Sequence, residues 1–307
     1  MRLIRGPAGL RRPSPGCVLT IGAYDGLHLG HQAMLGRLIE RAAAAAQPAV
    51  VVTFEPMPRE YLQPKDPPAR LTSLRERWRI LQAWPLDYLC VLRFDEALRN
   101  LSAQEFARVL SQQLGACSIV VGHDFRFGRQ GAATAEVLAQ AGSTLGFEVE
   151  VLPAVTLDGE RISSSGVRAA LAAGDFARAA RWLGRPWSMC ARVVAGRRLG
   201  RDLGFPTANL PLKRRRAPVA GVFAVRVHGI AGAPLAGVAS LGTRPTVAGT
   251  EALLEAHVFD FQGDLYGREI AVEFVAKLRE EAHFASLAAL TAQMHADAAE
   301  ARRILNA

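Results

Sequence analysis

Residues 17–31 read CVLTIGAYDGLHLGH, and this stretch decides the fold of the first half of the chain. An apolar run of strand length leads into a short loop with glycine, and a helical pattern follows over about 30–46. Continuous apolar runs are typical of strands that are buried on both faces of a parallel sheet. The stretch therefore predicts a loop with unusual chemistry at the carboxyl end of a buried strand.

Similar strand-like runs alternate with helical segments further along the chain. The runs cover 49–54, 86–94, 117–122 and 147–153, and the helical segments cover 73–83, 102–114 and 134–145. Ser102 and Glu105 have the spacing of a capping box, which supports the helix that begins there. This β-α-β-α order predicts an α/β domain over residues 1–185 with a doubly wound parallel sheet, whose ligands bind in the loops after the strands.

The pattern changes at about residue 186. Shorter runs separated by Gly and Pro follow at 189–196, 221–229, 235–242, 253–261 and 268–278. Alternating polar and apolar residues in several of them predict half-exposed strands. Residues 186–307 are therefore expected to form a small antiparallel β-barrel, ending in a helix over about 286–304 with Ser286 as its N-cap.

The chain is basic, but its charge is concentrated in one place. It has 307 residues, half of them hydrophobic, with 37 Lys and Arg against 28 Asp and Glu. Residues 192–216 hold eight of these cations against one acid, Asp202. An Arg-rich nucleic-acid-binding protein is therefore one alternative. We do not expect a nucleic-acid partner, because the basic segment carries no stacking aromatic residue beyond Phe205.

Other global features indicate a cytoplasmic protein without a membrane partner. No apolar stretch approaches the roughly 20 residues that span a bilayer. The first 16 residues, MRLIRGPAGLRRPSPG, lack the apolar region of a secretory signal. The four cysteines are scattered, which favours a reducing compartment. No feature of the sequence sets an oligomeric state.

The loop at 22–31 contains two histidines three residues apart where a strand gives way to a helix. It has neither the glycine fingerprint of dinucleotide-binding folds nor a P-loop lysine. Two imidazoles beside a helix N-terminus can hold a phosphate and stabilise negative charge. Surface histidines without a role are the alternative, and a zinc site lacks a third ligand nearby.

The second candidate segment is GRRLGRDLGFPTAN, residues 196–209. Its glycines allow the backbone to approach an anion, and its arginines supply positive charge. Thr207 and Asn209 are two residues apart, so their oxygens face one side of an extended segment and suit Mg²⁺. An ordinary charged surface loop is the alternative.

Taken together, the motifs resemble a known family. GAYDGLHLGH (22–31), TFEPMPRE (53–60), VGHDFRFG (121–128) and RISSSGVRAALAAGD (161–175) are similar to the HxGH nucleotidyltransferase superfamily, specifically the adenylyltransferase module of bacterial bifunctional riboflavin kinase/FAD synthetases. PTAN (206–209), LGTRPTV (241–247), EAHVFDF (255–261), GDLYG (263–267) and VEFVAKLREEAHF (272–284) resemble the riboflavin kinase module.

The resemblance implies roles for particular residues. It implies catalytic roles for His28, His31, Arg168 and Glu255. It implies ATP contacts for Gly22, Asp25, Gly26, Ser163 and Ser164 in the first domain, and for Gly196, Arg201, Gly204, Thr207 and Asn209 in the second. It implies flavin contacts for Asp124, Phe125, Phe127 and Arg279, and Mg²⁺ ligation by Thr207 and Asn209. Ser164 and Arg168, the latter in the first turn of a helix, would hold the leaving pyrophosphate.

The implied function is the ATP-dependent conversion of riboflavin to FMN in the second domain and of FMN to FAD in the first, with Mg²⁺. Three positions depart from the family pattern, which often has Phe, His and Asn where this chain has Tyr24, Met57 and Ser240. The alternative within the family is that only one of the two activities is retained.

Overall fold

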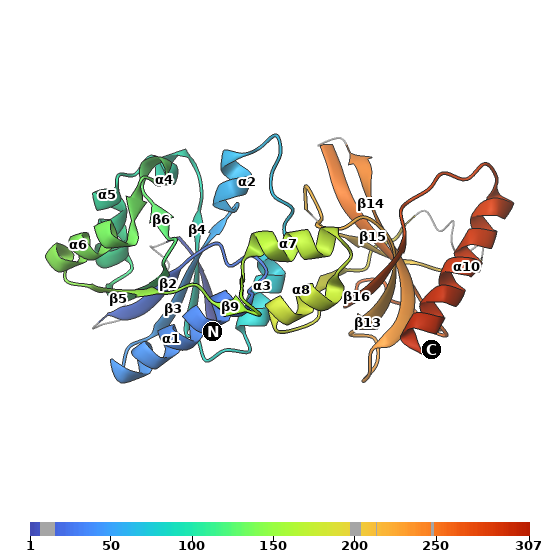
Figure 1. Cartoon of the computed structure of the whole chain (residues 1–307), viewed down its shortest axis with the longest axis horizontal. Coiled ribbons are helices and arrows are strands. Elements are labelled where there is room, and N and C mark those ends of the chain that lie inside the picture. Colours follow the sequence, from blue (N-terminus) through green and yellow to red (C-terminus); the bar gives the residue numbers. More distant parts are fainter. Residues whose placement is uncertain (7–15, 197–203, 213, 247–248) are drawn as a thin grey trace. The chain divides into compact units, whose positions relative to one another are not determined.

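The computed structural model describes residues 1–6, 16–196, 204–212, 214–246 and 249–307. The chain divides into two compact units. Unit 1 comprises Met1–Pro68 and Leu74–Ser163, and unit 2 comprises Ala69–Ser73 and Ser164–Ala307 (Figure 1). No helix among the described residues combines the length and the apolar character needed to cross a bilayer.

Unit 1 is built on a six-stranded sheet in which all neighbours are parallel. Its spatial order is β1 (Arg2–Arg5), β4 (Tyr88–Arg93), β3 (Ala49–Glu55), β2 (Cys17–Ile21), β5 (Ala116–Gly122) and β8 (Glu148–Leu152). The chain runs from β2 toward β3 and β4, then returns to β5 on the other side of β2. The loops after β2 and β5 therefore leave the sheet at its topological switch point, where such folds bind ligands.

Helices cover both faces of this sheet, as the prediction of a doubly wound fold requires. Alternate residues of β2 point to opposite faces, so that Leu19 packs in one core and Val18 in the other. The first core includes residues of α5 (Ala103–Arg108) and α6 (Ala135–Leu145). The second includes residues of α1 (Leu29–Ala44) and α3 (Leu74–Leu81). The predicted α/β fold is confirmed.

Shorter elements complete unit 1. The capping box at Ser102 is present, and α5 continues into the π-helical turn η2 (Val109–Gln113). The other short helices are α2 (Pro58–Leu62), α4 (Glu96–Arg99) and η3 (Arg129–Gly131). Two small antiparallel pairs are β6 (Arg126–Phe127) with β7 (Ala133–Thr134), and β9 (Thr156–Leu157) with β10 (Glu160–Arg161).

Unit 2 contains a six-stranded antiparallel sheet, drawn mainly in orange in Figure 1. Its order is β11 (Ser188–Arg192), β16 (Glu269–Arg279), β13 (Gly221–His228), β14 (Leu235–Thr246), β15 (Gly249–Val258) and β12 (Ala208–Pro211). A bridge between Val194 and Asn209 joins the segment after β11 to the edge strand β12, so the sheet nearly closes. The predicted barrel is confirmed.

The described residues of unit 2 include three helices. The predicted C-terminal helix is α10 (Leu287–Leu305), and the Ser286 side chain accepts a hydrogen bond from the backbone N–H of Ala289 as its N-cap. The other two are α7 (Ser164–Ala172) and α8 (Phe176–Leu183). Arg168 lies one position beyond the first turn of α7, and not within it as predicted, because the helix begins at Ser164.

Candidate active sites

The loop after β2 is wound tightly and held by buried side chains. Tyr24 and Leu27 have positive φ angles of 51° and 47°, which non-glycine residues seldom adopt, and Gly26 has a φ of 85°. The side chains of Tyr24 and Leu27 are fully buried, and the Tyr24 hydroxyl lies 2.6 Å from Thr20 Oγ1. These anchors fix an unusual backbone directly ahead of the two histidines.

His28 and His31 lie side by side at the N-terminus of α1, as their spacing predicts. Their rings are stacked, with centroids 3.7 Å apart and planes 15° from parallel. His28 is the N-cap of α1, and its Nδ1 accepts a hydrogen bond of 3.3 Å from the backbone N–H of His31. In the neutral imidazole of His28 the proton therefore lies on Nε2, which can donate to a phosphate oxygen.

Other predicted nucleotide contacts of unit 1 lie in the same loop or next to it. Gly22 is packed under the ring of Tyr24, and Asp25 is only 2% exposed. A Cβ added to Gly30 would lie 3.2 Å from the His28 ring and 4.0 Å from the Ile162 carbonyl oxygen. The segment that ends at Ser163 thus passes close to the N-terminus of α1.

The predicted flavin contacts of unit 1 lie in the loop after β5. Asp124 forms an ion pair with Arg161 of β10. The rings of Phe125 and Phe127 are stacked, with centroids 5.5 Å apart. Phe127 is 6% exposed and packs in the core of unit 1, so it supports the loop from beneath, while Phe125 is partly buried.

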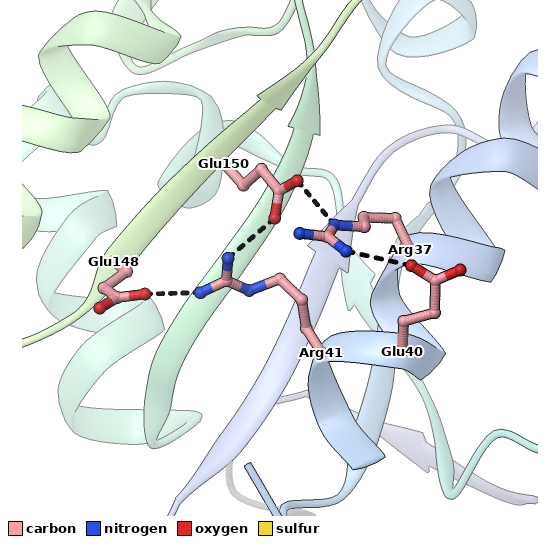
Figure 2. Close-up of polar contacts among 5 residues, drawn as sticks. All are labelled: Arg37, Glu40, Arg41, Glu148 and Glu150. Carbon is pink, nitrogen blue, oxygen red and sulfur yellow. Dashed lines mark hydrogen bonds and ion pairs between the residues drawn. The ribbon is translucent and has the colours of Figure 1, made fainter. Parts of the chain in front are cut away.

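An ion-pair network fastens α1 to the edge strand β8 (Figure 2). Arg37 and Arg41 both bond to Glu150, at 2.7 and 2.9 Å, and Arg41 also reaches Glu148 at 2.5 Å. Burial of the Glu150 carboxyl opposes ionisation, but the hydrogen bonds from the two arginines outweigh it and lower its pKa. The helix that carries the histidine pair is thereby tied to the sheet through its C-terminal half.

Ser164 and Arg168 belong to α7 in unit 2. Arg168 Nε donates a hydrogen bond of 2.6 Å to the Ala69 carbonyl oxygen of the same unit. The role of these two residues toward pyrophosphate stays a prediction.

In unit 2 the barrel brings two candidate kinase residues, Asn209 and Glu255, into one row with Ser240. Glu255 of β15 is paired directly with Asn209 of β12 on one side and with Ser240 of β14 on the other. Residues opposite one another in antiparallel strands share a face of the sheet. Ser240 Oγ donates to Glu281 Oε1 at 3.3 Å, so this departure from the family pattern makes a polar contact at the end of the row.

Gly196 packs against the side chain of Asn209. A Cβ at Gly196 would lie 2.4 to 2.5 Å from the atoms of the Asn209 amide, which real side chains do not permit. The Asn209 amide Nδ2 donates to the Thr207 carbonyl oxygen at 3.3 Å. Its Oδ1 is therefore the atom of the amide that suits a cation, and Mg²⁺ ligation by Asn209 stays a prediction.

Thr207 lines a pocket between the start of β12, the strand β15 and the loop that follows β15. The walls combine apolar and polar groups, and the lining residues are Val193, Pro206, Thr207, Ala208, Ala256, Val258, Phe261, Gly263, Asp264, Leu265 and Tyr266. The described residues contain no cluster of three or more His, Cys, Asp or Glu that could hold a metal. Neutral oxygens such as those of Thr207 and Asn209 fit Mg²⁺ that is held mainly by substrate phosphates.

The predicted flavin residue Arg279 is engaged by α10. Its Nε and Nη2 bond to both oxygens of Asp297 at 2.7 to 3.0 Å, and its guanidinium lies 5.5 Å from the centroid of the Phe284 ring. Asp297 is 6% exposed, so the pair is largely shielded from water. Its contact with flavin stays a prediction.

Part of the basic segment has a structural role. Arg214 is 3% exposed, and its Nη1 donates to the carbonyl oxygens of Arg70 and Leu71 at 2.9 and 3.2 Å. Arg192 donates to the Gly267 carbonyl oxygen. Gly204 has a φ of 82°, whereas Arg201 lies outside the described residues.

Sequence reasoning missed Arg77, which is fully buried in α3 and bonds to Ala23, Thr53 and Glu55. It stands in LRERWRIL, where alternating charges are typical of a solvated helix face. Only the helical spacing could have indicated that Arg77 is buried. It lies three residues after Leu74 and four before Leu81, so it is on the face of the helix that packs against the core.

The fold and the two sites define a nucleotide-dependent transferase with two domains. The first is a doubly wound domain with a histidine pair at its switch point, and the second is a barrel with the row of Asn209, Glu255 and Ser240. Residues 11–166 match the FAD synthetase family model, and residues 183–305 match the riboflavin kinase model. The chain belongs to the family of bifunctional riboflavin kinase/FMN adenylyltransferases.

Individual relatives cover almost the whole chain. A bifunctional riboflavin kinase/FMN adenylyltransferase from Pseudomonas fluorescens is 49% identical over 99% of this chain and 98% of its own length. The protein of the same name from Escherichia coli K12 is 46% identical over 98% of this chain and 97% of its own. A solved structure named as a macrolide-efflux protein from Streptococcus pneumoniae is 32% identical, with a TM-score of 0.78 and 97% of both chains covered.

Proposed function

We propose that this chain phosphorylates riboflavin with ATP to give FMN in its barrel, and transfers AMP from a second ATP to FMN to give FAD and pyrophosphate in its doubly wound domain. The observation that carries the proposal is the presence of two distinct sites in one chain, one in each domain. One is the stacked His28–His31 pair at a helix N-terminus, and the other is the Asn209–Glu255–Ser240 row.

In the first domain the chemistry is a direct displacement. A phosphate oxygen of FMN attacks the α-phosphorus of ATP, the bond to the β-phosphate oxygen breaks, and pyrophosphate leaves. Nε2–H of His28 and the backbone N–H groups at the start of α1 face the charge that develops on the phosphates. No side chain has to form a covalent intermediate, because positioning and charge stabilisation supply the rate.

In the barrel Glu255 acts as the general base. Its carboxylate accepts the proton of the 5′-hydroxyl of the ribityl chain as that oxygen attacks the γ-phosphorus of ATP. The bond between the γ-phosphorus and the oxygen that bridges to the β-phosphate breaks, and ADP leaves. The pocket beside Thr207, whose walls combine apolar and polar groups, suits the nucleoside of ATP. Thr207 and Asn209 would hold Mg²⁺, which neutralises charge on the phosphates when it is bound.

We also propose a reducing compartment, the cytoplasm. All four cysteines are free, and burial of the Cys17 and Cys90 thiols raises the pKa of each to about 12. Proteins of the cytosol rarely form disulfides, so four free cysteines fit this compartment.

The direct test incubates the purified chain with riboflavin, ATP and Mg²⁺ and follows FMN and FAD by chromatography. FMN should appear first and FAD later. Accumulation of FMN alone would support the alternative that only the kinase is retained, and no flavin product would contradict the proposal. A filter-binding assay with DNA and RNA across salt concentrations tests the nucleic-acid alternative, for which binding should fall steeply with salt.

Paired variants then assign the two sites, with each variant serving as the control for the other. His28→Ala with His31→Ala should lower FAD formation by about 100-fold or more and leave FMN formation unchanged. Glu255→Gln should lower FMN formation by about 100-fold and leave FAD formation unchanged when the assay starts from FMN. If either variant lost both activities while it remained folded, the assignment of one site to each domain would be wrong.

A further inference from the structure

We propose that Arg77 is a positioning residue for adenylyl transfer, which holds the loop that carries His28 against the end of β3. The inference rests on the proposed function, because it takes that loop as the nucleotide-binding loop of the first domain. Every residue in the argument belongs to unit 1.

The Arg77 side chain is fully buried and has partners on two neighbouring strand ends. Its Nη1 donates to the Ala23 carbonyl oxygen at 2.9 Å and to Thr53 Oγ1 at 2.8 Å. Its Nη2 donates to Glu55 Oε2 at 2.8 Å. Burying an arginine is costly unless its donors are satisfied, so these contacts define a specific site for the guanidinium.

The loop is held by side chains at both of its ends. At the Ala23 end, the Thr53 hydroxyl donates to the same carbonyl oxygen as Arg77, at 3.2 Å. At the other end, Gln32 Nε2 donates to the Leu27 carbonyl oxygen at 2.9 Å. Between these two points the backbone passes through the positive φ angles of Tyr24, Gly26 and Leu27. A backbone of this kind keeps its shape only when its surroundings hold it.

The position of His28 therefore depends on Arg77 through the backbone. A lysine at position 77 would retain the charge but could not reach all three acceptors at once, since its ammonium group is a compact donor on a flexible stem. The loop would relax, and the histidine pair would no longer meet the transition state in the right place. A misplacement of about 1 Å can cost about 100-fold in rate.

The test measures steady-state FMN adenylylation and riboflavin phosphorylation in the full-length chain for Arg77→Lys. We expect kcat for adenylylation to fall by about 100-fold, with a much smaller change in KM for ATP. The kinase rate should be unchanged. Arg79→Lys, on the exposed side of the same helix, is the matched control and should retain both activities.

Coupling to His28 separates positioning from a general loss of structure. If Arg77 acts through His28, then Arg77→Lys should slow a His28→Gln chain by no more than about twofold. Additive losses in the double variant, a parallel loss of kinase activity, or a full adenylylation rate for Arg77→Lys would each overturn the inference. A full rate for His28→Gln alone would instead contradict the proposed site.

Thr53→Val keeps the test decisive if Arg77→Lys fails to fold. Thr53 is 1% exposed, and valine has nearly its shape but removes the hydroxyl that bonds to both Arg77 and Ala23. We expect about a tenfold loss of kcat for adenylylation with unchanged kinase activity. An unchanged adenylylation rate in this variant would overturn the inference.

Discussion

At the residue scale, Tyr24 explains why a departure from the family pattern is compatible with the first site. Its ring lies 5.0 Å from that of His31, where a phenylalanine ring would also fit. The additional hydroxyl turns back into the core and meets Thr20, and burial raises the pKa of the phenol. Tyr24 therefore contributes a hydrogen bond to stability without removing the aromatic support of the histidine pair.

A double-variant cycle tests this role of Tyr24. Tyr24→Phe should lower the free energy of unfolding of the first domain by about 1 to 2 kcal/mol, because it leaves the buried Thr20 hydroxyl without its partner. Adding Thr20→Val should cost little more, since both polar groups are then gone. Urea unfolding followed by fluorescence measures both effects. A large loss of FAD formation in Tyr24→Phe would contradict the assignment, because the hydroxyl would then serve the reaction.

In the barrel, Gly196 fixes the position of the Asn209 side chain, because the two are in close contact. Gly196→Ala would push a methyl group into the Asn209 amide, which would displace a proposed Mg²⁺ ligand. We expect riboflavin phosphorylation to fall by about tenfold or more, with FAD formation from FMN unchanged. Gly232→Ala is the control, because nothing lies within 4 Å of the added carbon. Equal kinase rates in the two variants would show that the position of Asn209 is not critical.

At the element scale, α1 has the histidine pair at its N-terminus and is tied to the edge strand β8 through its C-terminal half. Arg37 and Arg41 bring positive charge onto Glu150, and the three side chains form a network in place of isolated ion pairs (Figure 2). Exposed single pairs add little to stability, whereas a network that shares one partly buried carboxylate retains more.

The network gives the first domain a pH-dependent stability. Because the pKa of Glu150 is lower in the folded than in the unfolded chain, its contribution is present above the ordinary pKa of a glutamate and is lost as pH falls through the lowered value. Glu150→Gln should therefore unfold more easily than the wild type at pH 7, by at most about 1 kcal/mol. The two should converge once the pH falls below the lowered pKa of Glu150.

Denaturant titrations at several pH values measure this difference. Glu40→Gln is the control, because Glu40 is 68% exposed and contacts Arg37 only from the same helix. A constant difference between wild type and Glu150→Gln across the pH range would show that Glu150 contributes by packing and not by charge.

The elements that the sequence predicts are those with a continuous apolar run or a clear capping signal. The runs at 49–54 and 117–122 became β3 and β5, and the capping box at Ser102 marked its helix. The strand β1 was not predicted, because RLIR is short and largely exposed and acquires strand structure only by pairing with β4. Arg77 was not predicted for a related reason: its partners Ala23 and Thr53 lie far away in the sequence, and only the fold brings them together.

At the scale of the whole molecule, two helices bear on where the second domain begins. The sequence places the boundary after residue 185, whereas α7 and α8 fall in one compact unit with the barrel. Phe176 of α8 lies with its ring centroid 5.9 Å from that of Phe223 and 6.2 Å from that of Phe274. These aromatic contacts predict that the barrel needs α8 for its stability.

Two fragments decide between these boundaries, one starting at residue 164 and one at residue 186, both ending at 307. The shorter fragment exposes Phe223 and Phe274, and burial of one phenylalanine side chain is worth about 1.5 to 3 kcal/mol. We expect its urea midpoint to be clearly lower, measured by fluorescence, and its kinase activity to be lost at lower urea.

Phe176→Ala in the full-length chain is the matched control and should lower the stability of the barrel by about 3 kcal/mol. Because the doubly wound domain has its own core, FAD formation from FMN should be unchanged in that variant. Equal midpoints for the two fragments would contradict this expectation and support a second domain that begins at residue 186.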